Sequence, residues 1–279
     1  MAEHSAAGPA VRQARVRAGL TLRELASAIG VSVGTMSAIE NGKVALTIDR
    51  LQQIARRLDI APAHLLAPQP DADRPRTLVP VVADWRHFAE LDLDPALRAA
   101  VTVFTEMGYH GATMRLVANA AESSVAGIYH YHRSKQHLLV TLMDLTLQDI
   151  EWRVSMADAE GGTNAERFAR MVEALALCHA VRRDLAFISA TEMRSLSEPD
   201  RSRVVAARRR IQDQLDTAAL AATADGTFAT PTPRDTARAV ATMCMALPYW
   251  FSSAGASTPA DVARQYADHA LAMMLVQPD

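Results

Sequence analysis

The sequence predicts an all-α protein with two helix-turn-helix modules followed by a larger helical bundle. Hydrophobic residues make up 49% of the 279 residues and aromatic residues only 5%, and β-branched runs are short, which favours helices over strands. Two separate stretches, residues 20–42 and 104–139, each show short helices joined by a tight turn. Helical patterning continues from residue 140 to the end of the sequence.

Composition restricts the function classes. The net charge of −2 argues against attraction of the whole molecule to nucleic acid, so DNA contact depends on local charge. Cys178 and Cys244 predict buried thiols rather than a disulfide framework, which fits a reducing cytoplasm. No apolar stretch is long enough to span a bilayer, and residues 1–10 do not resemble a signal peptide. We therefore expect a cytoplasmic protein without membrane contact.

The first module is expected over residues 1–67, as five short helices. Thr21 and Glu24 have the spacing of a capping box, Gly30 supplies a tight turn, and Ser32 begins the third helix. A fourth helix is expected over residues 48–58, and Pro62 begins a fifth. The module carries eight basic and five acidic residues, so its net charge favours contact with phosphates.

The pattern Gly-Leu-Thr-x-x-Glu-Leu-Ala, followed by Val-Ser and Thr-x-Ser-x-Ile-Glu-x-Gly, resembles the XRE (Cro and phage-repressor) DNA-binding domain. In that family the third helix enters the major groove. The resemblance implies the following DNA contacts: Ser32, Thr35, Ser37, Ala38, Asn41 and Lys43. Leu22 stands where the family usually has a phosphate-binding glutamine. A small helical domain that serves protein–protein contacts is the alternative interpretation.

A Pro-rich linker is expected over residues 68–93, because four prolines alternate with charged residues. Near its end, Trp85, Phe88 and Leu91 recur every three residues. This spacing predicts a short helix that docks on a folded module; a hydrophobic lead-in to the next domain is the alternative.

The second module is expected over residues 94–140. Asp94 followed by Pro95 is a typical helix start, and Gly108 is expected to end that helix. Thr113 and Ser124 are expected to begin the next two helices, and Ser134 a fourth. Residues 86–139 carry five basic and five acidic residues, so DNA binding here would depend on individually placed phosphate contacts.

The pattern Phe-x-x-x-Gly-Tyr-x-x-x-Thr, then Val-Ala-x-x-Ala and Ile-Tyr-x-Tyr-x-x-Ser-Lys-x-x-Leu-Leu, resembles the DNA-binding domain of TetR-family regulators. The resemblance implies contacts by phosphate-binding and groove-facing residues: Thr113, Ser124, Val125, Ala126, Gly127, Tyr129, His130, Tyr131 and Lys135. Three positions depart from the family: Glu122 replaces the usual turn glycine, Ser123 the usual valine and His132 the usual phenylalanine.

Residues 141–279 are expected to form a ligand-binding and dimerisation domain. Helical patterning covers residues 142–156, 165–181, 185–196, 201–222, 234–253 and 259–275, with Pro248 expected to kink the fifth of these. In TetR-like proteins the last two long helices form the dimer interface. The resemblance implies that role for two apolar faces: Ala237, Val240, Ala241, Cys244 and Leu247, and Val262, Tyr266, Ala270 and Met273.

Soft, adaptable side chains in this domain predict a pocket for a small hydrophobic effector, although a methionine stripe can equally be core. The pattern Arg-Arg-Asp-Leu-Ala-Phe-Ile, then Glu-Met-Arg-Ser-Leu, resembles TetR regulators of fatty-acid and steroid breakdown, which respond to acyl-CoA thioesters. The resemblance implies that Arg194, Arg201, Arg208 and Arg209 bind the CoA phosphates; a solvated charged face is the alternative. The predicted ligand-binding set is Met171, Leu175, Cys178, Phe187, Met193, Arg194, Arg201, Arg208, Met243, Trp250 and Phe251.

No nucleophile motif, metal-ligand spacing or Gly-rich phosphate loop is present, so an enzyme is not expected and no metal or cofactor is implied. The sequence predicts a homodimeric transcription regulator, most simply a repressor, that binds double-stranded DNA and is tuned by a small apolar effector such as an acyl-CoA. Two alternatives remain. The protein could organise DNA without a ligand, or its N-terminal module could bind another protein.

Overall fold

The computed structural model describes residues 7–18, 20–44, 46–58, 60, 62, 65 and 84–276. Within these ranges the chain forms helices, and the β-structure consists of one isolated bridge between Phe228 and Val276. The predicted all-α fold is confirmed. The chain divides into two compact units, Met1–Arg74 and Pro75–Asp279, which we describe separately.

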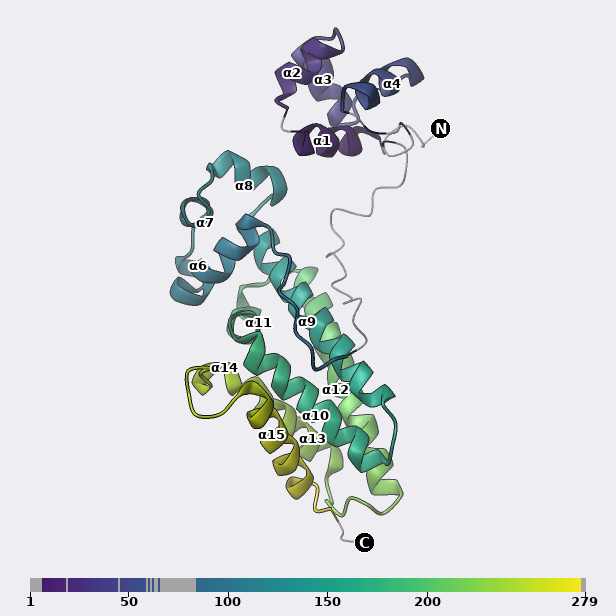
Figure 1. Ribbon diagram of the computed structural model, residues 1–279, viewed down its shortest axis with the longest axis vertical. Coiled ribbons are helices and arrows are strands. Elements are labelled where there is room, and N and C mark those ends of the chain that lie inside the picture. The colour runs from purple at the N-terminus through teal and green to yellow at the C-terminus, as the bar shows by residue number, and fades with distance from the viewer. Residues whose placement is uncertain are drawn as a thin grey trace. The chain divides into compact units, whose positions relative to one another are not determined.

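Within the described residues of the first unit, four helices (Figure 1) share an apolar core. They are α1 (Ala7–Arg17), α2 (Leu22–Ala28), α3 (Val33–Glu40) and α4 (Ile48–Arg57). The predicted capping box forms: the Thr21 side chain accepts a hydrogen bond from the Glu24 amide, and the Glu24 carboxylate accepts one from the Thr21 amide. The expected fifth helix, and most of the expected linker, fall largely outside the described residues.

The second unit begins with three helices of helix-turn-helix type: α6 (Pro95–Gly111), α7 (Met114–Ala120) and α8 (Val125–Tyr131). Asp94, Thr113 and Ser124 cap these helices as predicted. The expected end of the first helix at Gly108 is confirmed as a break in its helical backbone. Gly108 has φ +68° and kinks α6, and helical structure then resumes as far as Gly111.

The remaining helices form a bundle around one apolar core (Figure 1). They are α9 (Lys135–Ala159), α10 (Asn164–Val181), α11 (Arg183–Thr191), the 3₁₀ turn η1 (Glu192–Ser195), α12 (Asp200–Ala224), α13 (Pro233–Met245), α14 (Leu247–Trp250) and α15 (Pro259–Met273). Helix α10 packs against α9, α12, α13 and α15. Pro248 interrupts the long helix predicted over residues 234–253, because a proline cannot supply the amide that would continue it.

Residues 84–93, which we call the docked segment, contain no helix, so the short helix predicted there is wrong. The segment instead lies against the bundle. Trp85 is 1% exposed, and its indole N–H donates to Glu160 at 2.7 Å. The buried guanidinium of Arg153 donates to the carbonyls of Trp85 and His87, and lies over the Phe88 ring at 3.3 Å from its centroid. The aromatic residues therefore anchor the chain through packing against arginines rather than through helical structure.

Candidate functional site

In the first unit, α3 is the predicted DNA-reading helix and its exposed face carries the predicted residues. Ser32 caps the helix by accepting a hydrogen bond from the Thr35 amide at 3.0 Å, and its hydroxyl also bonds that of Thr35 at 2.8 Å. Asn41 is exposed and its amide nitrogen donates to the Ser37 carbonyl at 2.8 Å. Ser37 and Ala38 are half-buried, and Lys43 is exposed. The helix therefore presents small polar groups, with one cation beyond its end.

In the second unit, α7 and α8 are joined by a turn in which Glu122 has φ +50°. Only glycine adopts this left-handed region without strain. The corresponding turn of the first unit contains Gly30 at φ +69°. The replacement of the usual glycine by Glu122 therefore leaves the turn geometry unchanged and places both backbone strain and a negative charge two residues before the cap of α8.

The predicted groove-facing residues of α8 lie largely on its exposed side. Ser124, Val125 and Ala126 are exposed, Gly127 is half-buried, and the hydroxyl of Thr113 caps α7 on the exposed surface. Two aromatic rings stand out from the same helix: Tyr129 is 48% and Tyr131 65% exposed. The side chain of His130 lies outside the described part of the chain.

His132, which replaces the usual phenylalanine, is buried, and its Nε2 lies 2.9 Å from the Asp94 carboxylate. Burial alone would raise the pKa of Asp94. The hydrogen bonds from His132 and from the Leu97 amide outweigh this effect and lower the pKa. The histidine thus fills the aromatic position and ties the end of α8 to the start of α6.

Lys135 does not point freely into solvent. Its ammonium donates to the carbonyls of Tyr109 at 2.6 Å and Ala112 at 2.7 Å, and lies 4.2 Å from the centroid of the Tyr109 ring. Burial lowers the pKa of Lys135, and the charge of Glu192 acts in the opposite direction. In this structure the Lys135 ammonium donates to two carbonyls at the end of α6. A phosphate contact through Lys135 would therefore require the ammonium to donate both to the phosphate and to those carbonyls.

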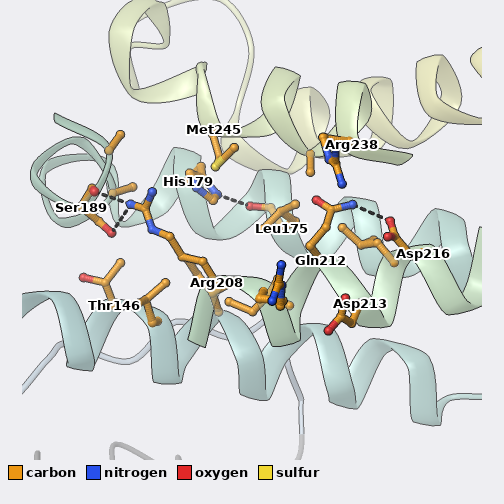
Figure 2. A pocket seen from close by; sticks show the side chains of 18 residues that line it. Thr146, Leu175, His179, Ser189, Arg208, Gln212, Asp213, Asp216, Arg238 and Met245 are labelled. Atoms are coloured by element: carbon orange, nitrogen blue, oxygen red, sulfur yellow. Dashed lines mark hydrogen bonds between the residues drawn. The ribbon is translucent and has the colours of Figure 1, made fainter. Parts of the chain in front are cut away.

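A cavity of about 310 Å³ lies within the bundle, between α9, α10, α11, α12 and α13 (Figure 2). It is within the size range of sites that enclose small molecules, at the lower end. Its apolar lining is Leu147, Ile150, Leu175, Ala186, Ala190, Ile211, Leu215, Ala241 and Met245. Its polar lining is Thr146, His179, Ser189, Arg208, Arg209, Gln212, Asp213, Asp216 and Arg238.

Polar side chains reach the cavity from several helices, among them α12 and α10. On α12, Arg208, Gln212 and Asp216 recur every four residues, and Gln212 donates to Asp216 at 2.7 Å. On α10, His179 Nδ1 bonds the Leu175 carbonyl at 2.7 Å (Figure 2). Burial lowers the pKa of His179 to about 4, so the ring is neutral near pH 7. The cavity is therefore amphipathic rather than uniformly apolar.

Of the predicted ligand-binding residues, Leu175 and Arg208 line this cavity. The other nine lie elsewhere. Met171, Cys178 and Phe251 are core residues, and the Cys178 thiol faces Asp149 at 3.9 Å. Arg194 and Arg201 are exposed, and Met193 and Met243 are half-buried off the cavity wall. Phe187 packs edge-on against Tyr249, and Trp250 stacks on Tyr266.

A sequence pattern indicates the cavity residues that the prediction missed. The missed residues Gln212 and Asp216 form a polar row with the predicted Arg208, on the helical face that also carries Ile211 and Leu215. A polar row on an otherwise buried face indicates either an internal network or a polar ligand. Of the predicted methionines and aromatic residues, Met171 and Phe251 fill the core, and the other four are half-buried or exposed away from the cavity.

The predicted dimer faces are wrong as assigned. The following predicted residues are at most 5% exposed: Ala237, Val240, Ala241, Cys244, Leu247, Val262 and Ala270. These residues pack inside the protomer, because α13 lies on α12 and α15 lies on α10. The opposite faces of the two helices remain exposed. They carry Ala239 and Thr242 on α13, Ala246 directly after it, and Gln265, His269, Ala272 and Met273 on α15.

Helix α11 connects the cavity to the helix-turn-helix. Ser189 on α11 lines the cavity. Three residues later, the Glu192 carboxylate accepts a hydrogen bond from the Tyr109 amide at 3.1 Å, directly after the kink at Gly108. The Ser195 hydroxyl donates to the same carboxylate at 2.7 Å. A displacement of α11 would therefore reach the end of α6.

Comparison with known proteins supports this division. Residues 11–65 match a family model described as Helix-turn-helix, and residues 96–142 match Bacterial regulatory proteins, tetR family. Residues 161–274 match Tetracyclin repressor-like, C-terminal domain. The fold and its modules thus define a DNA-binding regulator with a helical C-terminal domain.

Individual regulators are also similar to this chain in sequence or in fold. The chain is 34% identical over 76 residues to the HTH-type transcriptional repressor KstR of Mycolicibacterium smegmatis, a match that spans 27% of this chain and 37% of that relative. Among solved structures, PfmR of Thermus thermophilus is 27% identical with a TM-score of 0.59, over 63% of this chain and 97% of that one. AibR, solved with isovaleryl coenzyme A and operator DNA, is 24% identical with a TM-score of 0.57, over 64% of this chain and 95% of that one.

Residues 96–142 and 161–274 are thus similar to the N-terminal and C-terminal domains of TetR-family transcriptional regulators, and residues 11–65 are similar to a further helix-turn-helix domain. Within the described residues, no group of three or more His, Cys, Asp or Glu side chains could hold a metal ion. The described helices include none that is both long and apolar enough to cross a membrane.

Proposed function

We propose that the protein is a homodimeric repressor that binds operator DNA and is released from it, or repositioned on it, by a small amphipathic effector in the cavity of the second unit. The observation that carries the proposal is the combination of an exposed reading helix, α8, with a partly polar cavity in one compact unit. The similarity of residues 96–142 to TetR-family regulators supports the DNA-binding half of the proposal.

The proposed DNA contacts of the second unit are the exposed residues of α7 and α8. Ser124, Val125 and Ala126 would face base edges, and Tyr129 and Tyr131 would reach phosphates on either side. In the first unit, Thr35 and Asn41 on α3 would play the corresponding part. No arginine lies on the exposed centre of either helix, so sequence choice would depend on thymine methyl contacts and DNA shape more than on bidentate base contacts.

The proposed dimer uses the exposed faces of α13 and α15. Small side chains such as Ala239, Ala246 and Ala272 permit close approach of helices from two protomers. Two-fold symmetry would place two copies of α8 on one face of the duplex, about 34 Å apart. The separation of these helices is then the property that an effector would change.

The effector would act through α11. Arg208 and His179 lie in the cavity beside Ser189 of this helix, and Glu192 at its end bonds the backbone of the helix-turn-helix. Acyl-CoA thioesters are one candidate class, because AibR, which has the same fold, was solved with one. An effector shifts the equilibrium only if it binds one spacing of the reading helices more tightly than the other.

The proposal is tested by selecting bound duplexes from a random-sequence pool and measuring their affinity with and without candidate effectors. Tyr129→Ala is expected to weaken binding to every selected duplex by a similar factor, because phosphate contacts carry no sequence information. Asn41→Ala tests whether the first unit reads bases: a changed selected sequence would support this, and an unchanged one would favour a protein-binding role. Affinity that no effector alters would favour a DNA-organising protein.

A further inference from the structure

Arg208 is a half-buried cation on the cavity wall without an acidic partner among the described residues. Two other arginines of α12 are paired: Arg203 with Asp144 and Asp200, and Arg210 with Glu151 at 2.7 Å. Arg208 instead uses one nitrogen, Nη2, to donate to the Ser189 carbonyl and, at 3.1 Å, to the Ser189 hydroxyl. Among the described residues, none forms an ion pair with it.

The surroundings do not neutralise this charge. Figure 2 shows the guanidinium beside Ser189 and His179, with Asp213 and Asp216 away from it. Asp216 accepts the hydrogen bond from Gln212. His179 is neutral near pH 7, so it neither adds a second cation nor supplies an anion. Burial lowers the pKa of Arg208, but an arginine in a protein remains protonated.

A buried charge is unfavourable unless a counter-charge and hydrogen bonds compensate for the lost water. The planar guanidinium presents parallel N–H groups that match the two oxygens of a carboxylate. Apolar side chains of the same cavity, including Leu147, Ile150 and Ile211, would surround a hydrocarbon body. A phosphate monoester carries close to two charges at pH 7 and would need a second cation beside Arg208; Arg209 and Arg238 also line the cavity, so decyl phosphate is the decisive competitor in the test.

We propose that the effector is an amphipathic monocarboxylate whose anionic head pairs with Arg208 inside the cavity. This inference rests on the proposed effector function and specifies its ligand class. The carboxylate would occupy the N–H groups that the protein leaves free, and the hydrocarbon would fill the remainder of the cavity of about 310 Å³. The head group would then lie next to Ser189, on the helix that ends at Glu192.

The test is calorimetric titration of the full-length protein with four probes that share one chain length: decanoate, decanol, decyl phosphate and decanoyl-CoA. Hexanoate and tetradecanoate serve as shorter and longer carboxylates. Decanoate is expected to bind at least tenfold more tightly than decanol, the factor that corresponds to a charge-assisted hydrogen bond. Equal binding of decanol, tighter binding of decyl phosphate or of decanoyl-CoA, or no binding of any of the three carboxylates would overturn the proposal.

Three variants assign the effect to a residue. Arg208→Met, which keeps the bulk and removes the charge, is expected to lose at least tenfold in decanoate affinity with decanol affinity unchanged or increased. Arg208→Lys is expected to recover part of the loss. Arg210→Met is the matched control, one exposed arginine on the same helix, and is expected to bind like the wild type. Circular dichroism checks that each variant is folded, and an Arg208→Met protein that is folded and binds decanoate normally would also overturn the proposal.

The carboxylate site and the proposed effector response can be refuted independently of each other. If decanoate binds through Arg208 and leaves DNA affinity unchanged, the carboxylate site stands and the effector response is wrong. If a neutral molecule releases DNA and decanoate does not bind, the effector response stands and the carboxylate site is wrong.

Discussion

Glu122 gives a direct test of how the second reading helix is held. Its φ of +50° is in the left-handed region, and a side chain there costs about 1–2 kcal/mol. Replacement by glycine removes that strain but adds about 0.5–1 kcal/mol of unfolded-state entropy. Glu122 is exposed and forms no ion pair within the described residues, so no contact is lost. We expect Glu122→Gly to increase the free energy of unfolding by about 0.5–1 kcal/mol.

The charge of Glu122 is tested separately by Glu122→Gln, which keeps the strained backbone. A unit charge about 10 Å from a phosphate weakens binding by about twofold in water before screening. Both variants should therefore bind duplex DNA more tightly than the wild type at low salt, with a smaller gain at high salt. Urea unfolding and fluorescence anisotropy measure the two effects.

Backbone strain at Glu122 is contradicted if Glu122→Gly is less stable than the wild type, or if Glu122→Gln is stabilised by as much as Glu122→Gly. The first result would mean that the turn is not strained. The second would mean that the charge, and not the backbone, determines its stability. Gly30→Ala in the first unit is the reverse control: it introduces a side chain at φ +69° and should be destabilising.

Three further outcomes are expected. Arg153→Met should cost about 3 kcal/mol of unfolding free energy, because Asp149 loses its 2.9 Å partner, keeps only Arg182 at 3.6 Å, and two carbonyls of the docked segment are released. Urea unfolding at fixed protein concentration measures this, and the exposed Arg210→Met should cost less than about 1 kcal/mol. His179 has a folded-state pKa of about 4 and an unfolded one of about 6.5. The unfolded ring therefore binds a proton first as pH falls. Stability attributable to His179 should be constant above about pH 7 and fall by about 3 kcal/mol toward pH 4, and a His179→Gln variant with the same pH profile as the wild type would contradict this. Glu192→Ala should leave effector affinity unchanged and reduce the ratio of DNA affinities measured without and with effector; an unchanged ratio would show that the signal takes another path.

The helix starts were predictable because their causes are local. Thr21, Asp94, Thr113 and Ser124 each cap the helix expected to follow, and a cap requires only a side-chain oxygen and the amides two or three residues later. The turn at Glu122 was predictable for the same reason, since the pattern around it marks where a glycine usually stands.

The docked segment and the cavity were not predictable from spacing. Trp85, Phe88 and Leu91 have a helical repeat, but they pack in a non-helical conformation because Arg153 supplies hydrogen bonds to the carbonyls of Trp85 and His87 that a helix would have paired internally. The arginine is 65 residues further along the chain than Phe88. A contact of this kind follows from the packing of α9 against the segment, which local sequence does not encode.

Arg201 and Arg208 show which property of a side chain helical periodicity determines and which it does not. Seven residues is close to two turns, so both side chains leave α12 in nearly the same direction. Yet Arg201 is exposed, whereas Arg208 lies in the cavity, because the two turns are about 10 Å apart along the axis and only the second is covered by α11 and α13. The sequence determines the direction in which a side chain leaves the helix, whereas the neighbouring helices determine how deeply that side chain is buried. Burial in turn determines what compensates the charge of an arginine. Water compensates the charge of an exposed arginine, whereas a covered arginine without a carboxylate neighbour needs an anion from outside the protein.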